Sequence, residues 1–170
     1  MPTSKELTIR LEDQPGTLAK FCKTLADHKV NILAFQASES VPADRKSVVR
    51  IVVDNATSAK KALDGERLSY TEAEIAQVKL PNRPGELGRV ALQLGNANIN
   101  IEHAYSGLDA SNSPVVFFGV KDVSKAVAVL DKIAAQRNQS SISASHFPGV
   151  VENGRTAPGL TFHSTSIRRR

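Results

Sequence analysis

The chain has 170 residues, of which 41% are hydrophobic and 23% charged, a composition typical of one globular domain or two small ones. It excludes a fully disordered or collagen-like chain, and no apolar run approaches the ~20 residues that cross a bilayer. The formal net charge is +5, but residues 136–170 hold five arginines and one glutamate, which leaves +1 for residues 1–135. We therefore expect no general preference for nucleic acid or membrane surfaces.

Reactive residues are few and scattered. Cys22 is the single cysteine, so neither an intrachain disulfide nor a cysteine metal cluster can form, and its place on an apolar helix stripe favours a core position. The histidines show no ligand spacing, and phosphate-binding, dinucleotide and nucleophile motifs are absent from the sequence. The first residues lack the apolar segment of a secretory signal. We expect a cytoplasmic protein with no enzymatic activity, no cofactor and no metal.

In chain order, the first predicted element is a strand at residues 7–11, where apolar and polar side chains alternate. Gln14-Pro15-Gly16 then breaks the strand, and apolar residues at i, i+3, i+4 and i+7 predict a helix over 18–25. Four further elements follow: strands at 30–37 and 47–53, a short helix around 59–63 ended by Gly65, and a strand at 67–71.

The same order repeats after a shift of 69 residues. Residues 7–32 align with 76–101 through seven identities: Leu11/Leu80, Pro15/Pro84, Gly16/Gly85, Leu18/Leu87, Leu25/Leu94, Asn31/Asn100 and Ile32/Ile101. A match at one fixed shift indicates an internal duplication, so both copies should fold alike. In the second copy we expect strands at 99–106 and 114–121 and a helix over 123–136.

The predicted architecture is an α+β fold of two tandem ferredoxin-like βαββαβ units, each an antiparallel sheet with its helices on one face. The units are assigned to residues 6–72 and 73–136. Beyond residue 136 the periodicity ends, and residues 137–170 are expected to form a flexible basic tail. The last strand of the second unit is poorly marked, and 140–145 is its best candidate.

These motifs resemble a tandem pair of ACT domains, which are small amino-acid-sensing regulatory modules. The resemblance rests on Asp13-Gln14-Pro15-Gly16-Thr17-Leu18 with Asn31-Ile32, and on Asn82-Arg83-Pro84-Gly85-Glu86-Leu87 with Asn100-Ile101. It covers about residues 6–135. The resemblance implies a non-catalytic regulatory protein that binds a free amino acid where two such units meet, with these sixteen residues as its ligand-binding set.

The residues of the two motifs suit such a ligand. A helix that begins after Gly16 or Gly85 presents unpaired N–H groups to an α-carboxylate. Asp13 offers an anion to an α-ammonium group, whereas Asn82 offers a neutral carbonyl. Asn31 and Asn100 supply amides that both donate and accept. A purely structural role for both loops is the alternative, because Pro-Gly is also a common entry turn to a helix.

The resemblance leaves the partners open. We expect a homodimer without direct nucleic-acid or membrane contact, and with a partner enzyme as one option. One alternative is a regulatory subunit of a biosynthetic enzyme of the acetolactate synthase small-subunit type, and another is a tandem-ACT transcription co-regulator. RNA binding, which the same strand order supports in RRM domains, is disfavoured because Phe117 and Phe118 are adjacent and point to opposite sheet faces.

Overall fold

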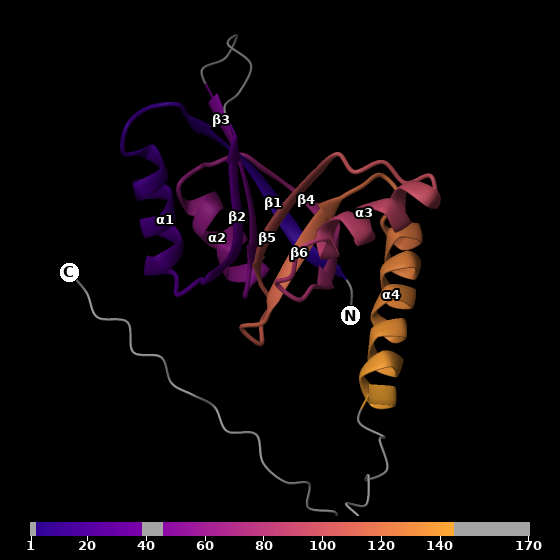
Figure 1. Ribbon diagram of the computed structural model, residues 1–170. Coiled ribbons are helices and arrows are strands. Elements are labelled where there is room, and N and C mark those ends of the chain that lie inside the picture. Colours follow the sequence, from indigo (N-terminus) through magenta and orange to yellow (C-terminus); the bar gives the residue numbers. More distant parts are fainter. Residues whose placement is uncertain (1–2, 39–45, 145–170) are drawn as a thin grey trace, which may run out of the picture.

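The computed structural model describes residues 3–38 and 46–144, with side chains described to residue 136 (Figure 1). Its elements, in chain order, are β1 (Thr3–Glu12), α1 (Thr17–Asp27), β2 (Ile32–Ser38), β3 (Lys46–Val53), α2 (Ala56–Gly65), β4 (Tyr70–Lys79), α3 (Glu86–Asn96), β5 (His103–Leu108), β6 (Pro114–Gly119) and α4 (Val123–Ala144). The predicted helices and strands are present in the predicted order up to α4, except that one continuous strand, β4, replaces two expected ones and no strand follows α4 in the described residues.

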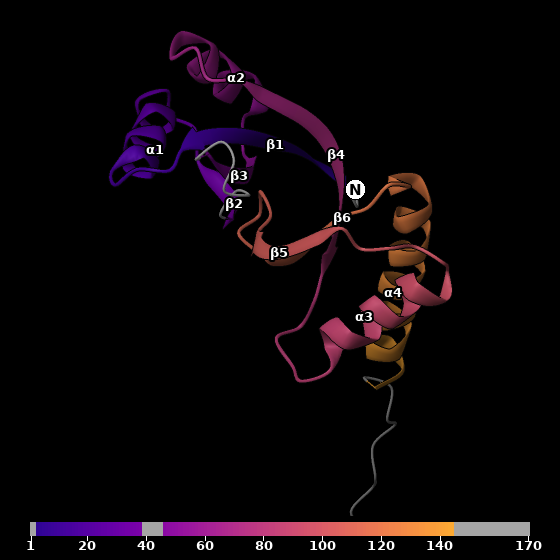
Figure 2. The same ribbon diagram turned by 90° about the horizontal axis from the view of Figure 1, so that it is seen from above.

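The six strands form one closed antiparallel barrel in the order β1-β3-β2-β5-β6-β4. Helices α1 and α2 lie outside the barrel on one side, and α3 and α4 lie on the other (Figure 2). The expectation of two separate sheets is therefore wrong in this respect. Closure gives every strand two neighbours, which removes the unpaired edges that two open sheets would expose.

Strand β4 crosses the expected boundary between residues 72 and 73 without a break. Its first part, from Tyr70 to Ala76, pairs with β1, and its last part, from Ala76 to Lys79, pairs with β6. Strand β1 is shared in the same way, because its residues 3–9 pair with β4 and its residues 6–12 pair with β3. Two strands that each serve both halves replace the two separate terminal strands that the repeat predicts.

The missing last strand of the second half is supplied by β1. Residues 140–144, the best candidate for that strand from sequence, belong instead to α4, so that prediction is wrong. Helix α4 also extends past residue 136, where the tail was expected to begin. The expectation of a flexible tail after residue 144 falls outside the described residues.

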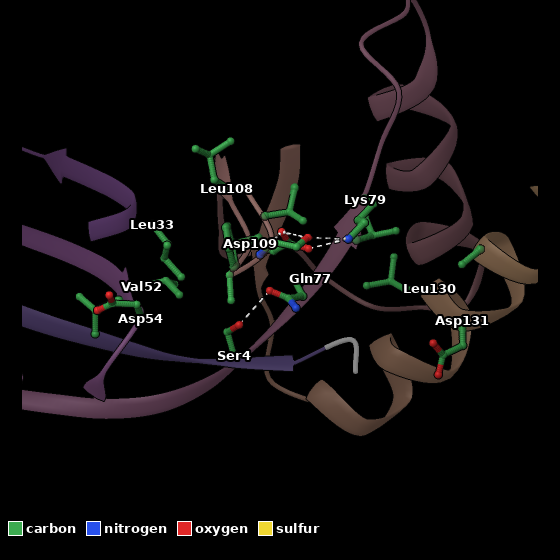
Figure 3. A pocket seen from close by; sticks show the side chains of 17 residues that line it. Ser4, Leu33, Val52, Asp54, Gln77, Lys79, Leu108, Asp109, Leu130 and Asp131 are labelled. Atoms are coloured by element: carbon green, nitrogen blue, oxygen red, sulfur yellow. Dashed lines mark hydrogen bonds and ion pairs between the residues drawn. The ribbon is translucent and has the colours of Figure 1, made fainter. Parts of the chain in front are cut away.

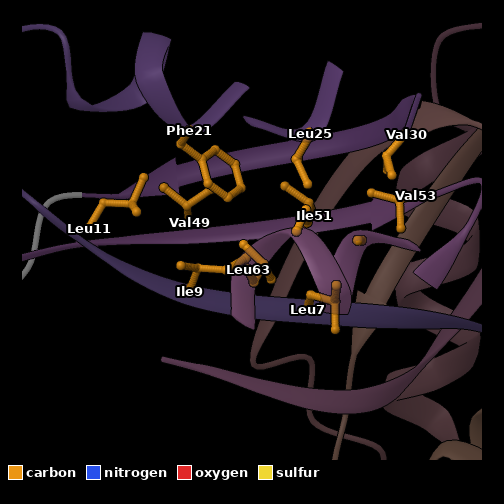
Figure 4. Close-up of a cluster of buried hydrophobic side chains, with 12 residues drawn as sticks. Leu7, Ile9, Leu11, Phe21, Leu25, Val30, Val49, Ile51, Val53 and Leu63 are labelled. Atoms are coloured by element: carbon orange, nitrogen blue, oxygen red, sulfur yellow. The ribbon is translucent and has the colours of Figure 1, made fainter. Parts of the chain in front are cut away.

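Each pair of helices covers its own apolar cluster on the outer face of the barrel. Leu7, Ile9 and Leu11 of β1 pack with Phe21 and Leu25 of α1 (Figure 4). The corresponding cluster of the second half is built on Ala76, Val78, Val90, Leu94, Phe118, Ala126, Leu130 and Ile133. The alternation of apolar residues that marked these strands in the sequence thus identifies the side facing the helices.

A third apolar cluster, Ala34, Val52, Ile75, Val115 and Phe117, lies on the opposite faces of the strands, inside the barrel. Phe117 and Phe118 belong to different clusters and are both buried, as the alternation requires. Neither ring is available to stack on a base. Cys22 packs partly buried against the first cluster, in agreement with its assignment to the core.

Just after the C-caps of helices α1 and α3 stands a residue with positive φ, Lys29 (57°) and Asn98 (54°) respectively. The left-handed conformation costs an L-residue other than glycine about 1 kcal/mol or more, and Asn tolerates it better than Lys. We expect Lys29→Gly to raise the free energy of unfolding by about 0.5–1 kcal/mol after the extra chain entropy of glycine is subtracted. Urea denaturation measures the change, and Asn98→Gly should give a smaller gain. A loss of stability at Lys29→Gly would contradict this account of the helix end.

Candidate functional site

The two predicted loops both begin their helices on a glycine in the left-handed conformation. Gly16 has φ 88° at the N-cap of α1, and Gly85 has φ 86° at the N-cap of α3. A Cβ at either glycine would meet no atom within 4 Å. The backbone angle therefore requires glycine here, and the space beside each helix start is open to solvent.

The hydrogen bonds of the loops leave most of their polar groups accessible. Thr17 N–H donates to the Gln14 carbonyl (3.2 Å), and Glu86 N–H donates to the Arg83 carbonyl (3.4 Å), which closes each turn. Neither helix has a side-chain cap, so part of each first turn still presents N–H groups. Most of the loop residues are exposed: Asp13, Gln14, Pro15, Gly16, Leu18, Asn82, Arg83, Pro84, Gly85 and Leu87.

Asp13 and Asn31, which the sequence assigns to one half, do not come together. Glu12, just before the first loop, pairs with Lys46 at one end of β3, whereas Ile32 pairs with Val53 at the other end. Asn31 is fixed through its backbone, because its N–H donates to Asp54 Oδ1 (3.0 Å) and its carbonyl accepts from Asp54 N–H (3.1 Å). Within one half, loop and asparagine therefore lie at opposite ends of the barrel.

The register instead brings each loop to the end where the other half's asparagine lies. Lys79 of β4 pairs with Val115, Val115 with Gly107, and Gly107 with Ala34 of β2. The loop after β4, residues 80–85, thus leaves the barrel at the end where Asn31 enters it. By the same antiparallel order, Asn100 and Ile101 precede β5 at the end where the first loop lies.

A cavity of about 440 Å³ lies beside the first loop and includes Thr17 in its lining. Four cationic side chains line it, namely Arg10, Lys20, Lys46 and Arg67, against the two carboxylates of Glu12 and Glu66. Lys46 pairs with Glu12 at 3.5 Å and Lys20 with Glu66 at 3.4 Å. The lining keeps a net positive charge next to the N-terminus of α1, and both features favour an anion there.

A polar cluster that the sequence did not predict ties the two halves together inside the barrel. Glu6 of β1 is 5% exposed and accepts hydrogen bonds from His103 Nε2 (3.0 Å) and Tyr105 Oη (2.7 Å) of β5. Arg50 Nε lies 4.0 Å from the other Glu6 oxygen. Burial and the bond to Glu6 raise the pKa of Tyr105 well above its usual value, so the phenol stays a donor.

Gly119 makes room for this cluster, and Gly107 makes room for the contact between β2 and β5. A Cβ at Gly119 would overlap the His103 ring, and a Cβ at Gly107 would overlap Ala34 Cβ and the Leu33 carbonyl. Gly107 and Ala34 are the residues through which β2 and β5 pair. The sequence gives a weak signal for the cluster, since His103 follows the second Asn-Ile pair, but Glu6 looks like an outward polar residue until the barrel closes over it.

The turn between β5 and β6 is organised by Asp109. Its Oδ1 accepts from Ser111 Oγ (2.6 Å), Ser111 N–H (2.9 Å) and Ser113 N–H (2.9 Å), and its Oδ2 pairs with Lys79 Nζ (2.6 Å). The hydrogen bond from Lys79, and then those from Ser111 and Ser113, lower the pKa of Asp109 well below its usual range. The ionised form is therefore part of the folded state.

A lowered pKa in the folded state means that Asp109 adds stability above its unfolded pKa of about 3.9 and that this stability is lost as the pH falls further. We expect the free energy of unfolding of the wild type to fall more steeply below about pH 4 than that of Asp109→Asn. Denaturant unfolding at a series of pH values compares the two slopes. Parallel profiles would contradict the role of the carboxylate.

In the described part of the chain no helix is long and apolar enough to cross a membrane. Among those same residues, no group of three or more His, Cys, Asp or Glu side chains has an arrangement that could hold a metal ion.

Residues 5–64 match the model of the ACT domain family. The resemblance inferred from the Pro-Gly motif is thus confirmed for the N-terminal half, whereas a second, tandem ACT domain stays a prediction. No protein among the curated sequences matches the chain.

Solved structures share the fold across most of the chain. Protein BT0572 from Bacteroides thetaiotaomicron is 27% identical with a TM-score of 0.68, covering 78% of this chain and 89% of its own. The regulatory subunits of aspartate kinase from Thermus thermophilus and Thermus flavus are 19% and 17% identical, with TM-scores of 0.51 and 0.52. They cover 77% and 78% of this chain and 91% and 92% of their own. The comparisons therefore show an ACT domain match at residues 5–64 and an α+β fold shared with these structures.

Proposed function

We propose that the chain is a non-catalytic, cytoplasmic regulatory protein that binds a free amino acid where its two ACT-like halves meet. The ACT match over residues 5–64 supports this role. The fold shared with regulatory subunits of aspartate kinase is consistent with it. The binding residues are the two loops, 13–18 and 82–87, together with Asn31, Ile32, Asn100 and Ile101.

The basic cavity beside Thr17, whose lining residues all lie between Arg10 and Ser69 of the first half, supports the carboxylate part of the proposal. An α-carboxylate at the start of α1 meets unpaired N–H groups, the positive end of the helix and the net positive lining of the 440 Å³ cavity. Asp13 lies on the same loop and offers a carboxylate to the α-ammonium group. An amino acid presents both charges at once, so the first loop fits it better than a simple carboxylate.

Binding at such a site has a regulatory consequence. The register brings each loop to the end where the other half's asparagine lies, so a ligand held by both would favour one relative position of the halves. A homodimer or a complex with a partner enzyme would transmit that preference. We propose both as the assemblies to look for, by sedimentation of the purified chain and by co-purification.

Asp13→Asn is expected to weaken amino-acid binding about tenfold, because the charge-assisted bond to the ammonium group becomes a neutral one. Asparagine keeps the oxygen that accepts from Ser47 Oγ at 3.3 Å, so the fold should be unaffected. Isothermal titration calorimetry of both proteins with the same amino acid measures the ratio. Asn82→Ala is the matched variant at the second loop and should have the smaller effect.

Equal losses at Asp13 and Asn82, or a larger loss at Asn82, would assign the ammonium group to the second loop. Unchanged affinity in both variants would remove the loops from the binding site and favour their purely structural role.

A further inference from the structure

Helix α3 carries a large apolar residue at its most outward position. Val90 and Leu94 are buried in the second apolar cluster, and Leu92 lies about 200° around the helix from both. Leu92 is 62% exposed, more than any other large hydrophobic residue that the structure describes. Figure 2 shows α3 at the periphery of the molecule, beside α4. Leu92 therefore points away from the rest of the chain.

The internal repeat gives the matched position in the first half. Leu92 aligns with Lys23, which is exposed and pairs with Asp27 at 2.7 Å, and Asp27 aligns with Asn96. The outer side of α1 thus has the charges expected of a helix face in water, whereas the outer side of α3 has none. From residue 90 to residue 101 the sequence contains no Asp, Glu, Lys or Arg. An apolar, uncharged surface of this kind is typical of the centre of an interface.

Two glycines flank Leu92 on the same side of the helix. Gly88 and Gly95 stand where α1 has Ala19 and Ala26. Neither has a positive φ, and a Cβ at either would meet no atom within 4 Å. Glycine inside a helix is less favourable than alanine, and here neither the backbone angle nor packing within the chain requires it. The close approach of another helix would make use of the missing side chain.

We propose that a second copy of the chain binds this side of α3, with the two α3 helices antiparallel about a two-fold axis. We call Gly88, Leu92, Gly95 and Asn96 the α3 face. In a two-fold interface residue i contacts residue j of the partner and j contacts i, so one surface must carry both a projection and the matching recess. Leu92 and Gly88, one turn apart, are such a pair: each Leu92 would lie over the partner's Gly88.

The charges at the two ends of α3 fit the antiparallel arrangement. Arg83 precedes the helix and Glu102 follows it, both are exposed, and neither has an ion pair with the residues that the structure describes. Antiparallel packing brings each Arg83 to the end where the partner's Glu102 lies, whereas parallel packing brings like charges together. Two helices of about three turns bury less than the roughly 1,200–2,000 Å² of a stable interface. We therefore expect a reversible dimer with a micromolar dissociation constant.

The α3 face is separate from the large cavity of the barrel. That cavity, of about 760 Å³, opens at the end where Leu33 follows Asn31 and Ile32 and where Lys79 precedes the second loop (Figure 3). Its lining includes residues of α4 but none of α3. The inference rests on the proposed function only in naming the face of its homodimer, and it requires no bound amino acid.

Sedimentation equilibrium of the full chain without ligand, from dilute to high-micromolar protein, tests the proposal. We expect the wild type to pass from monomer to dimer. Leu92→Lys gives α3 the residue of the matched position in α1 and should weaken dimerisation about tenfold or more, because it places a charge at the centre of the interface. Gly88→Leu should weaken it as well, because it fills the recess. Both positions are exposed and both new residues favour a helix, so both variants should fold.

Lys23→Gln is the matched control, because it changes the same position of the repeat outside the α3 face and should dimerise like the wild type. The proposal is overturned if the wild type stays monomeric at every concentration, if all three variants dimerise alike, or if Lys23→Gln is as weak as Leu92→Lys. A monomeric wild type that still responds to amino acids would overturn this interface alone. Dimerisation without any response to amino acids would overturn the ligand site alone.

Discussion

Gly107→Ala is expected to lower the free energy of unfolding by about 2–3 kcal/mol. The new methyl group would overlap Ala34 and the Leu33 carbonyl, which is backbone and cannot rotate away. Gly107 and Ala34 form the pair that joins β2 to β5 and closes the barrel between its halves. Guanidinium denaturation of the full chain measures the loss, and the denaturant dependence shows whether unfolding stays cooperative.

Gly95→Ala is the matched control for that change. Gly95 lies in α3, and a Cβ there meets no atom within 4 Å. Since alanine favours a helix over glycine by about 0.8–1 kcal/mol, this variant should be slightly more stable than the wild type. If the Gly107→Ala protein were as stable as the wild type, β2 and β5 would have to be farther apart at Gly107 than they are in the structure.

Glu6→Ala is expected to lower the free energy of unfolding by about 3 kcal/mol, which is the second large effect. Removal of the carboxylate leaves His103 Nε2 and Tyr105 Oη without their acceptor inside the barrel, and Arg50 without its nearest anion. The free energy of unfolding from urea titration gives the loss. A double-mutant cycle with Tyr105→Phe should give a coupling energy of about 1 kcal/mol or more, because the two residues share one hydrogen bond.

Glu12→Ala on the same strand is the comparison. The Glu12 side chain is 57% exposed and meets Lys46 at 3.5 Å, so its loss should change stability by less than about 0.5 kcal/mol. Equal effects of Glu6→Ala and Glu12→Ala would mean that the interior polar cluster does not join the two halves.

The local structure of the chain was predictable because its signals are local. Period-2 alternation in Leu7, Ile9 and Leu11 identifies the face that packs under the helices, and Pro-Gly at 15–16 and 84–85 identifies turns whose glycines need positive φ. The repeat at a shift of 69 residues predicted the order α3, β5, β6 and α4 of the second half, but it also predicted a last strand that the described residues do not contain.

The closure of the barrel was not predictable from those signals. Glu6 and Thr8 read as a solvent-facing row beside Leu7 and Ile9, yet Glu6 is buried because strands from both halves surround it. The sharing of β1 and β4 depends on pairings between distant residues, such as Thr3 with Ala76, which no local pattern encodes. Residues 140–145 were the best candidate for the poorly marked last strand of the repeat, but 140–144 belong to α4 and β1 takes the place of that strand beside β4.

A thermal-shift screen of the full chain against the twenty amino acids tests the central claim most directly. A ligand that binds only the folded state at 100 times its dissociation constant adds about 2.7 kcal/mol, which raises the melting temperature by several degrees. We predict such a rise for one or a few amino acids, and a reduced rise in Gly16→Ala or Gly85→Ala, where the added methyl group strains a backbone at φ 88° or 86°. No shift with any amino acid, or an equal shift in both glycine variants, would contradict an amino-acid site at these loops.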